Sequence, residues 1–246
     1  MEKLGTPIKE GKAKILFRTD EGTILMRFKD DLTALDGLKH DQMAAKGKYN
    51  SVISARLLEQ LESEGIPTHL IRLVEPGLME VKQVEMIPIE VVYRNVAMGS
   101  IVRRLGLTPG TTFSEPVVEY YLKNDELHDP WINEDHIVLL GLASRDELAR
   151  IRDLTIKVND ALSRFLDERG LVLADFKVEF GRLDGELLVA DEITCDSMRL
   201  LDKDAFSQGS IVEYDKQIFR DGGSKEEVAN AYRNAYKRIV GEDPPF

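Results

Sequence analysis

The sequence predicts an α+β fold built on antiparallel sheets. Strand-like segments cluster early in the chain, and strands mixed with helices follow. The regular strand–helix alternation of a parallel sheet is not visible, and no Gly-rich phosphate loop follows a strand. These observations argue against Rossmann and P-loop folds.

The N-terminal part is predicted to be rich in strands. Residues 13–28 read as a hairpin, because apolar side chains alternate on both sides of a turn at 19–22. From Asn50 the apolar side chains recur every four residues, which predicts a helix that ends at Gly65. Three strands are predicted next, at residues 69–75, 78–87 and 89–94.

We expect two modest domains in a chain of 246 residues. Pro88 cannot donate a hydrogen bond to a central strand ladder, so a boundary is placed there. The predicted domains are residues 1–88, rich in β-structure, and residues 89–246, of mixed α+β structure.

Helices are predicted mainly in the second half. A short helix at 97–105 leads through a loop at 106–115 to a strand at 117–122 and a polar loop containing Trp131. Ser144 and Glu147 have the spacing of a capping box, which begins a helix that runs to Gly170. The remaining predicted elements are strands at 171–180 and 186–193 and a helix capped at Ser224.

Composition excludes several classes of function. The net charge of −11 argues against a nucleic-acid-binding protein. No apolar run has the roughly 20 residues that a membrane span needs, and the first residues lack the pattern of a signal peptide. Cys195 is the only cysteine, which suits a reducing compartment. We therefore expect a cytoplasmic protein without a nucleic-acid or membrane partner.

Charged residues alternate along the strand predicted at 171–180. Asp175, Lys177 and Glu179 would share one face, because successive strand side chains point to opposite sides. The other face is apolar and suits a protein core. Alternation alone favours a solvated sheet face, so the acids at the end of the next strand carry the functional interpretation.

Glu179 and Asp191 are candidate metal ligands. A five-residue loop at 181–185 would place Asp191 on the face of Glu179, whereas a two-residue turn at Asp184-Gly185 would reverse that parity. Crowded carboxylates repel one another unless a cation lies among them, and Mg²⁺ is commonly held by one or two carboxylates plus nucleotide phosphates.

Two further motifs suit phosphate groups. Lys12 and Lys14 alternate at the start of the first hairpin, although a solubilising strand edge has the same pattern. Arg94 precedes Gly99 and Ser100, which begin a predicted helix, and an Arg with a Ser hydroxyl suits a phosphate monoester. A merely capped helix is the alternative interpretation.

At these residues the sequence resembles the phosphoribosylaminoimidazole-succinocarboxamide synthase (SAICAR synthetase) family, from about residue 8 to residue 240. The most specific blocks are Arg94-Asn95 with Gly99-Ser100, and the segment 175–181. Supporting blocks occur in order at residues 10–14, 29–37, 46–47, 123–125, 128–130 and 215–216. Within 194–199, the chain departs from the usual family pattern at Cys195 and Met198, while Asp196 and Arg199 are retained.

The resemblance implies a fold and a reaction. The fold would have a small nucleotide lobe, as in kinases and ATP-grasp enzymes, with ATP in the cleft between two domains. The reaction would be an ATP-dependent ligation in purine biosynthesis. In it, L-aspartate is joined to the carboxylate of carboxyaminoimidazole ribotide to give an amide, ADP and phosphate. ATP and Mg²⁺ are the implied cofactors, and a homodimer is a family-level expectation.

The resemblance also implies roles for individual residues. Lys12, Ala13 and Lys14 would bind ATP phosphates, the backbone near Met86 would contact adenine, and Glu179 and Asp191 would bind Mg²⁺. Arg94, Ser100 and Arg199 would bind the ribotide phosphate. The residues implied at the reacting centre are Asp36, Lys123, Asp129, Asp175, Lys177 and Asp196. Asp129 or Asp175 would accept the proton of the aspartate amine.

Two other functions fit the same residues. A small-molecule kinase would use the same lysines and metal-binding carboxylates, but without dependence on aspartate. A non-catalytic nucleotide-binding or assembly protein would retain ligand binding after Glu179 and Asp191 were neutralised.

Overall fold

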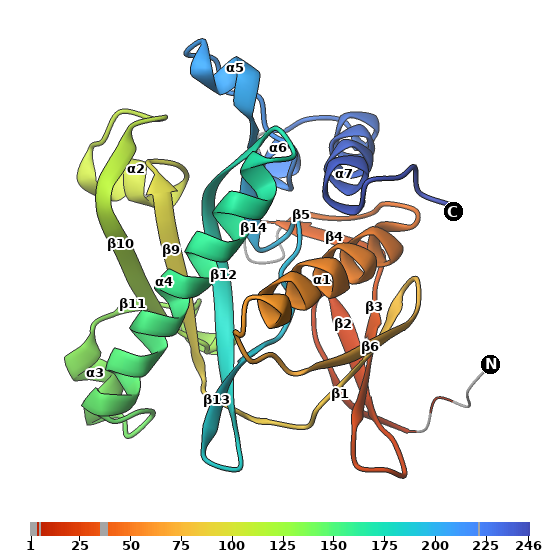
Figure 1. Cartoon of the computed structure of the whole chain (residues 1–246), viewed down its shortest axis with the longest axis vertical. Coiled ribbons are helices and arrows are strands. Elements are labelled where there is room, and N and C mark those ends of the chain that lie inside the picture. The colour runs from red at the N-terminus through yellow and green to blue at the C-terminus, as the bar shows by residue number, and fades with distance from the viewer. Residues whose placement is uncertain (1–3, 5, 35–38, 221) are drawn as a thin grey trace.

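The computed structural model describes residues 4, 6–34, 39–220 and 222–246, and its fold is α+β, as predicted (Figure 1). The strand pairs within its sheets are antiparallel. Within the described residues, no helix has the length and apolar character that a membrane crossing requires.

The first sheet has five strands in the order β1-β2-β3-β7-β6. The strands are β1 (Pro7–Glu10), β2 (Lys14–Arg18), β3 (Ile24–Phe28), β6 (Leu70–Glu75) and β7 (Leu78–Val81). The predicted hairpin at 13–28 is confirmed as β2 and β3. Helix α1 (Lys46–Ser63) packs on this sheet, and β4 (Asp31–Ala34) pairs separately with β5 (Lys39–Gln42).

The second sheet has seven strands and is organised around the long strand β12 (Leu171–Leu183). β12 pairs with β9 (Ile89–Val96), β13 (Glu186–Ala190), β14 (Met198–Asp202) and β8 (Glu85–Met86). β10 (Thr112–Leu122) and β11 (Trp131–Ile132) extend the sheet beyond β9. Helix α4 (Arg145–Asp167) crosses one face of this sheet (Figure 1).

Short helices connect these strands. They are α2 (Ser100–Leu105), the 3₁₀ helix η1 (Asp125–Leu127), α3 (Glu134–Leu139), α5 (Lys203–Ser207) and α6 (Gln217–Arg220). The C-terminal helix α7 (Lys225–Val240) packs against α1 (Figure 1). A helix from the end of the chain therefore lies beside a helix from its beginning.

The chain passes from the first sheet to the second through residues 82–88. The predicted strand at 78–87 is wrong as one element, because its first part is β7 of one sheet and its last part is β8 of the other. β8 pairs with β12 at Gly181, where a Cβ atom would lie 2.3 Å from Cγ2 of Val84. Glycine at position 181 therefore allows the crossing segment to approach β12.

Other boundaries also differ from the prediction. α1 begins four residues before Asn50, because the Asp30 carboxylate accepts hydrogen bonds from the backbone N–H groups of Ala45 and Gly47. β10 begins at Thr112, inside the predicted loop, and Trp131 belongs to β11 rather than to a loop. At α4 the Ser144 side chain caps as predicted, but the Glu147 carboxylate binds Arg182 and completes no capping box.

Candidate active site

A cleft of about 520 Å³ lies between the first sheet and β12. Its walls come from β1, β2 and β3 on one side, and from β12 and the crossing segment on the other. Its apolar lining is formed by Ile8, Ala13, Leu16, Ile24, Met26, Val81, Val84 and Met86. The cleft therefore offers an apolar surface for a heterocycle next to a strongly charged region.

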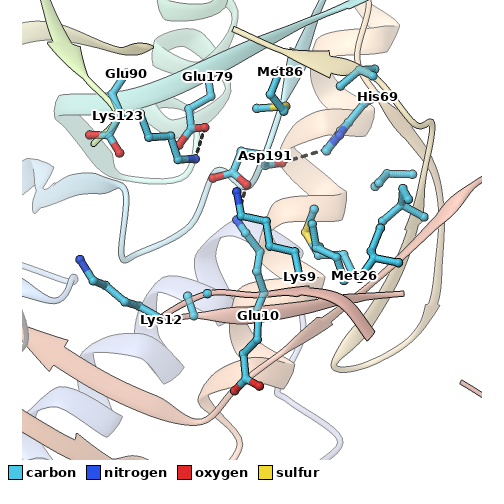
Figure 2. A pocket seen from close by; sticks show the side chains of 18 of the residues that line it. Lys9, Glu10, Lys12, Met26, His69, Met86, Glu90, Lys123, Glu179 and Asp191 are labelled. Atoms are coloured by element: carbon cyan, nitrogen blue, oxygen red, sulfur yellow. Dashed lines mark hydrogen bonds and ion pairs between the residues drawn. The ribbon is translucent and has the colours of Figure 1, made fainter. Parts of the chain in front are cut away.

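The charged region joins three lysines to buried carboxylates. Lys123 binds the Glu179 carboxylate, and Lys14 binds Asp191. Lys177 donates to Glu179 over 3.0 Å and to Glu90 over 2.7 Å. Figure 2 shows Lys123, Glu179 and Asp191 close together at the β12 side of the cleft.

Burial and mutual charge set the protonation of this cluster. Burial and the neighbouring Asp191 charge raise the pKa of Glu179. Burial also opposes the charge of Asp191, but Lys14, Lys123 and Lys177 outweigh it and hold the pKa of Asp191 well below its usual range. Burial likewise opposes the charge of Lys177, yet Glu179 and Glu90 raise its pKa. The cluster therefore keeps the Asp191 carboxylate charged among three lysine side chains, while burial lowers the pKa of Lys14.

The Asp191 side chain lies on the same side of the sheet as Glu179 because the backbone bends, and not because of its position along the strand. The turn between β12 and β13 is the two-residue one, with Leu183 opposite Glu186 and Glu179 opposite Ala190. A continued strand would place Asp191 on the face away from Glu179. Instead β13 ends at Ala190, and Asp191 takes a left-handed conformation with φ 63°. This bend returns its carboxylate to the cleft.

His69 also lines the cleft. Its Nε2 atom lies 2.9 Å from the backbone oxygen of Asp191. A dashed line in Figure 2 marks this contact. Burial lowers the pKa of His69 to about 4, so the ring is neutral at physiological pH.

A second cavity, of about 340 Å³, adjoins the cleft. Both are lined by Glu90 and Lys177. The second cavity takes its other charged residues from β9, β12, β14 and the segment before β14: Arg94, Asp175, Asp196 and Arg199.

Two arginines of the second cavity hold Asp175. Asp175 lies directly between Arg94 of β9 and Arg199 of β14 in the strand register. Arg94 Nη1 donates to Asp175 over 3.2 Å, and Arg199 Nη1 donates over 2.8 Å. Arg94 also donates to the Ser100 hydroxyl over 3.2 Å. The guanidinium groups and the hydroxyl therefore form one group of donors that suits a phosphate monoester.

Arg199 has room beside Gly99. The φ angle of Gly99 is 64°, and a Cβ atom there would lie 2.4 Å from Arg199 Nη2. Arg199 Nε is buried and has no hydrogen-bond partner among the described residues. An anionic ligand would supply a partner of the right charge.

Asp196 is fixed by residues from both ends of the chain. Its carboxylate accepts hydrogen bonds from Lys46 and Asn50 of α1 and from the Tyr232 hydroxyl of α7. Burial opposes its charge, but Lys46 and Lys216 hold the pKa of Asp196 well below its usual range. Asp196 therefore lines the cavity as a charged and immobilised carboxylate.

The sequence and the fold match known proteins along almost the whole chain. A family model described as SAICAR synthetase matches residues 7–239. The phosphoribosylaminoimidazole-succinocarboxamide synthase of Methanocaldococcus jannaschii is 46% identical over 215 residues, which are 87% of each chain. The enzyme of the same name from Methanothermobacter thermautotrophicus is 45% identical over 243 residues, covering 98% of this chain and 95% of its own.

The chain belongs to the SAICAR synthetase family. A solved structure described as SAICAR synthetase (Type-2) in complex with ADP has a TM-score of 0.90 and 42% identity, covering 97% of this chain and 99% of its own. Membership confirms the function expected from the sequence, an ATP-dependent ligase of purine biosynthesis.

The structure brings the residues expected for a SAICAR synthetase into the two adjoining cavities. The cleft beside the first sheet is lined by Lys12, Ala13, Lys14, Met86, Lys123, Asp129, Lys177, Glu179 and Asp191. The second cavity is lined by Arg94, Ser100, Asp175, Lys177, Asp196 and Arg199. Asp36 lies outside the described residues.

Several residues of these cavities were not predicted from the sequence. Glu90 alternates with Arg94 along β9, so strand periodicity contained the signal for it. His69 carries no local signal, because its ring reaches the Asp191 oxygen across 122 positions of sequence. Behind the second cavity, Tyr232 was likewise not predicted, because it reaches Asp196 only across 36 positions.

Proposed function

We propose that the chain joins L-aspartate to the carboxylate of carboxyaminoimidazole ribotide, with ATP in the cleft and the ribotide in the second cavity. The observation that carries this assignment is that the two cavities adjoin at Lys177 and Glu90. A nucleotide in one and a carboxylate substrate in the other would place their reacting groups near the Lys177 ammonium.

The carboxylates of the cleft fit Mg²⁺. Glu179 and Asp191 supply oxygen ligands, which Mg²⁺ prefers, and the Asp191 charge is near enough to raise the pKa of Glu179. No cluster of three or more metal-binding side chains occurs among the described residues. A site with two protein carboxylates therefore leaves the other positions to phosphate oxygens and water, the usual arrangement for Mg²⁺ with a nucleotide. Bound Mg²⁺ would neutralise phosphate charge.

The lysines of the cleft complete the nucleotide site. Lys12 and Lys14 enter from the loop before β2 and from β2 itself, where the phosphates of a nucleotide in the cleft would meet them. Met86 of β8 and the apolar residues of β1 to β3 would contact the base. Lys177 would stabilise negative charge on the oxygens of the transferred phosphoryl group, because positioned cations are the main contribution of proteins to phosphoryl transfer.

The second cavity would bind the ribotide by its phosphate. Arg94, Ser100 and Arg199 present donors to one region, and Arg199 Nε is buried without a partner among the described residues. Ligand phosphate would compete with Asp175 for the two guanidinium groups. Asp175, or Asp129 in the cleft, would then accept the proton that the aspartate amine loses on attack.

The reaction is tested by measuring ADP and amide product from ATP, Mg²⁺ and carboxyaminoimidazole ribotide, with and without L-aspartate. Equal amounts of ADP and product, formed only with aspartate, are expected. ADP formation that is indifferent to aspartate would contradict the proposal and favour a kinase or an ATPase.

Two variants assign the proton acceptor. Asp129→Asn and Asp175→Asn are compared in single-turnover experiments with Lys203→Gln, a control on α5 outside both cavities. The variant that loses the proton acceptor should slow product formation by roughly 10²–10⁴-fold. A normal rate in both Asp variants would rule out both carboxylates.

The domain division also belongs to this proposal. The strands of the first sheet end at residue 81 and those of the second begin at residue 85, close to the predicted boundary at residue 88. We propose that residues 1–88 form the nucleotide lobe and residues 89–246 the ribotide-binding part. A cytoplasmic location stays an expectation from the sequence, and a homodimer stays an expectation from the family.

A further inference from the structure

A short segment before β6 lies along the outer edge of β13. Thr68 forms an isolated parallel bridge with Val189. The Val189 backbone N–H donates to the Pro67 oxygen over 2.9 Å, and the His69 backbone N–H donates to the Val189 oxygen over 2.9 Å. The chain that enters the first sheet is thereby attached to the last strand residues before Asp191.

The His69 side chain extends this attachment past the end of the strand. Its Nε2 atom lies 2.9 Å from the Asp191 backbone oxygen. A carbonyl oxygen can only accept a hydrogen bond, so Nε2 carries the proton and donates. His69 therefore holds Val189 through its backbone and Asp191 through its ring, one on each side of Ala190.

The hydrogen bond from the His69 ring is accepted by a residue whose backbone departs from regular strand geometry. Asp191 is a non-glycine residue with φ 63°, a conformation that persists only where surrounding contacts determine it. Strand parity would direct its carboxylate away from Glu179, and the bend at this residue returns it to the cleft. What fixes the bend thus fixes the position of the carboxylate.

We propose that His69 is a positioning residue for Asp191: its ring holds the Asp191 carbonyl, fixes the left-handed bend and so aligns the carboxylate with Glu179 for a nucleotide-bound divalent cation. The inference rests on the proposed metal role of Asp191. His69 itself contacts main chain rather than metal, in the manner of outer residues that orient metal ligands.

The readout is the gain in ADP affinity that Mg²⁺ produces, measured by calorimetry on the full chain with and without the ion. His69→Leu keeps apolar bulk and removes the donor. It should reduce the Mg²⁺-dependent gain by about 10–100-fold, the range found when a residue that orients a metal ligand is lost. Affinity for ADP without Mg²⁺ should stay within about twofold, because the apolar lining is unchanged.

Conservative variants distinguish positioning from a general structural role. His69→Gln carries an amide donor that can reach the Asp191 oxygen and should restore most of the gain. Thr68→Val is the matched control: beside the same strand edge it removes the hydroxyl that donates to Glu62 and accepts from the Leu70 backbone N–H, and it should lower the melting temperature without changing the gain. If His69→Leu does not fold, His69→Asn replaces it, because its shorter amide cannot reach that oxygen.

Three results would overturn the inference. They are a full Mg²⁺-dependent gain in His69→Leu or His69→Asn, equal losses with and without Mg²⁺, and no recovery in His69→Gln. Asp191→Asn separates this inference from the proposed function. If Asp191→Asn retains the full Mg²⁺-dependent gain in ADP affinity, the metal role of Asp191 is refuted. If Asp191→Asn loses the gain while His69→Leu retains it, only the positioning role of His69 is refuted.

Discussion

The Tyr232 hydroxyl of α7 donates a hydrogen bond to the buried Asp196 carboxylate, and Tyr232→Phe removes this donor without changing the packing of the ring. A hydrogen bond to a charged group contributes about 1.5–3 kcal/mol to the free energy of unfolding. Lys46 and Asn50 still neutralise or solvate the carboxylate, so a value near 2 kcal/mol is expected. For a chain of this length that corresponds to roughly 4–8 °C in melting temperature.

The pH dependence of this loss has a definite sign. Burial opposes the Asp196 charge, whereas Lys46, Lys216 and the Tyr232 hydroxyl hold the pKa of Asp196 below its usual value of 3.8. A depressed carboxyl pKa contributes stability that is present above the unfolded value and is lost as the pH falls through the folded value. Because the unfolded state is common to parent and variant, the difference between them should be constant above about pH 4 and shrink only as the pH falls through the depressed folded pKa of Asp196.

The free energy of unfolding is measured by urea denaturation at pH 8 and at lower pH, and the KM for the ribotide is measured on the same proteins. Tyr236→Phe is the control, because Tyr236 is buried on the same helix and packs against Tyr49 and Phe246. The control should change stability by less than Tyr232→Phe does, because it removes no hydrogen bond to a buried carboxylate. A loss below about 0.5 kcal/mol in Tyr232→Phe, or an equal loss in both variants, would refute the reasoning.

Three further expectations follow from the same geometry. Gly99→Ala places a Cβ atom at φ 64° and ψ −129°, which costs about 1–3 kcal/mol, and displaces Arg199, so kcat/KM for the ribotide in steady-state kinetics should fall by about 100-fold; an unchanged kcat/KM would contradict this. Lys177→Met should lower the single-turnover rate by about 10²–10³-fold while ADP still binds in calorimetry; a normal rate would remove Lys177 from the chemistry. Burial raises the pKa of Asp215 to about 7, so between about pH 4 and pH 7 the folded state binds more protons than the unfolded state and stability falls as pH rises. Denaturation should show this slope in the parent and not in Asp215→Asn, and equal slopes would contradict it.

Local sequence patterns predicted the elements whose signals are local. The helix after Ser144 and the hairpin at 13–28 were found because capping and alternation are properties of neighbouring residues. The start of α1 was missed because its cap comes from Asp30, fifteen positions or more before the groups it binds. The crossing at 82–88 was missed because its strands pair with two different sheets.

The site divides in the same way. Asp175, Lys177 and Glu179 were predicted to share a face, and all three line the two cavities, because period two is a property of the strand itself. The position of Asp191 depended on a turn whose length the sequence left open, and on a backbone bend that no residue pattern announces. Partners such as Tyr232 become visible only when the last helix packs against the first.

Because β12 is the central strand of the second sheet, its position determines where the chain tolerates an insertion or a deletion. A deletion of one codon between Asp175 and Glu179 would turn one of these two side chains toward the core. The two cavities would then no longer both be lined by charged residues of β12. A few residues beyond, the exposed turn at Asp184-Gly185 already has both φ angles positive and makes no contribution to either cavity. A reporter peptide inserted at this turn would sit at the far end of the same strand while leaving the spacing of its charged residues intact.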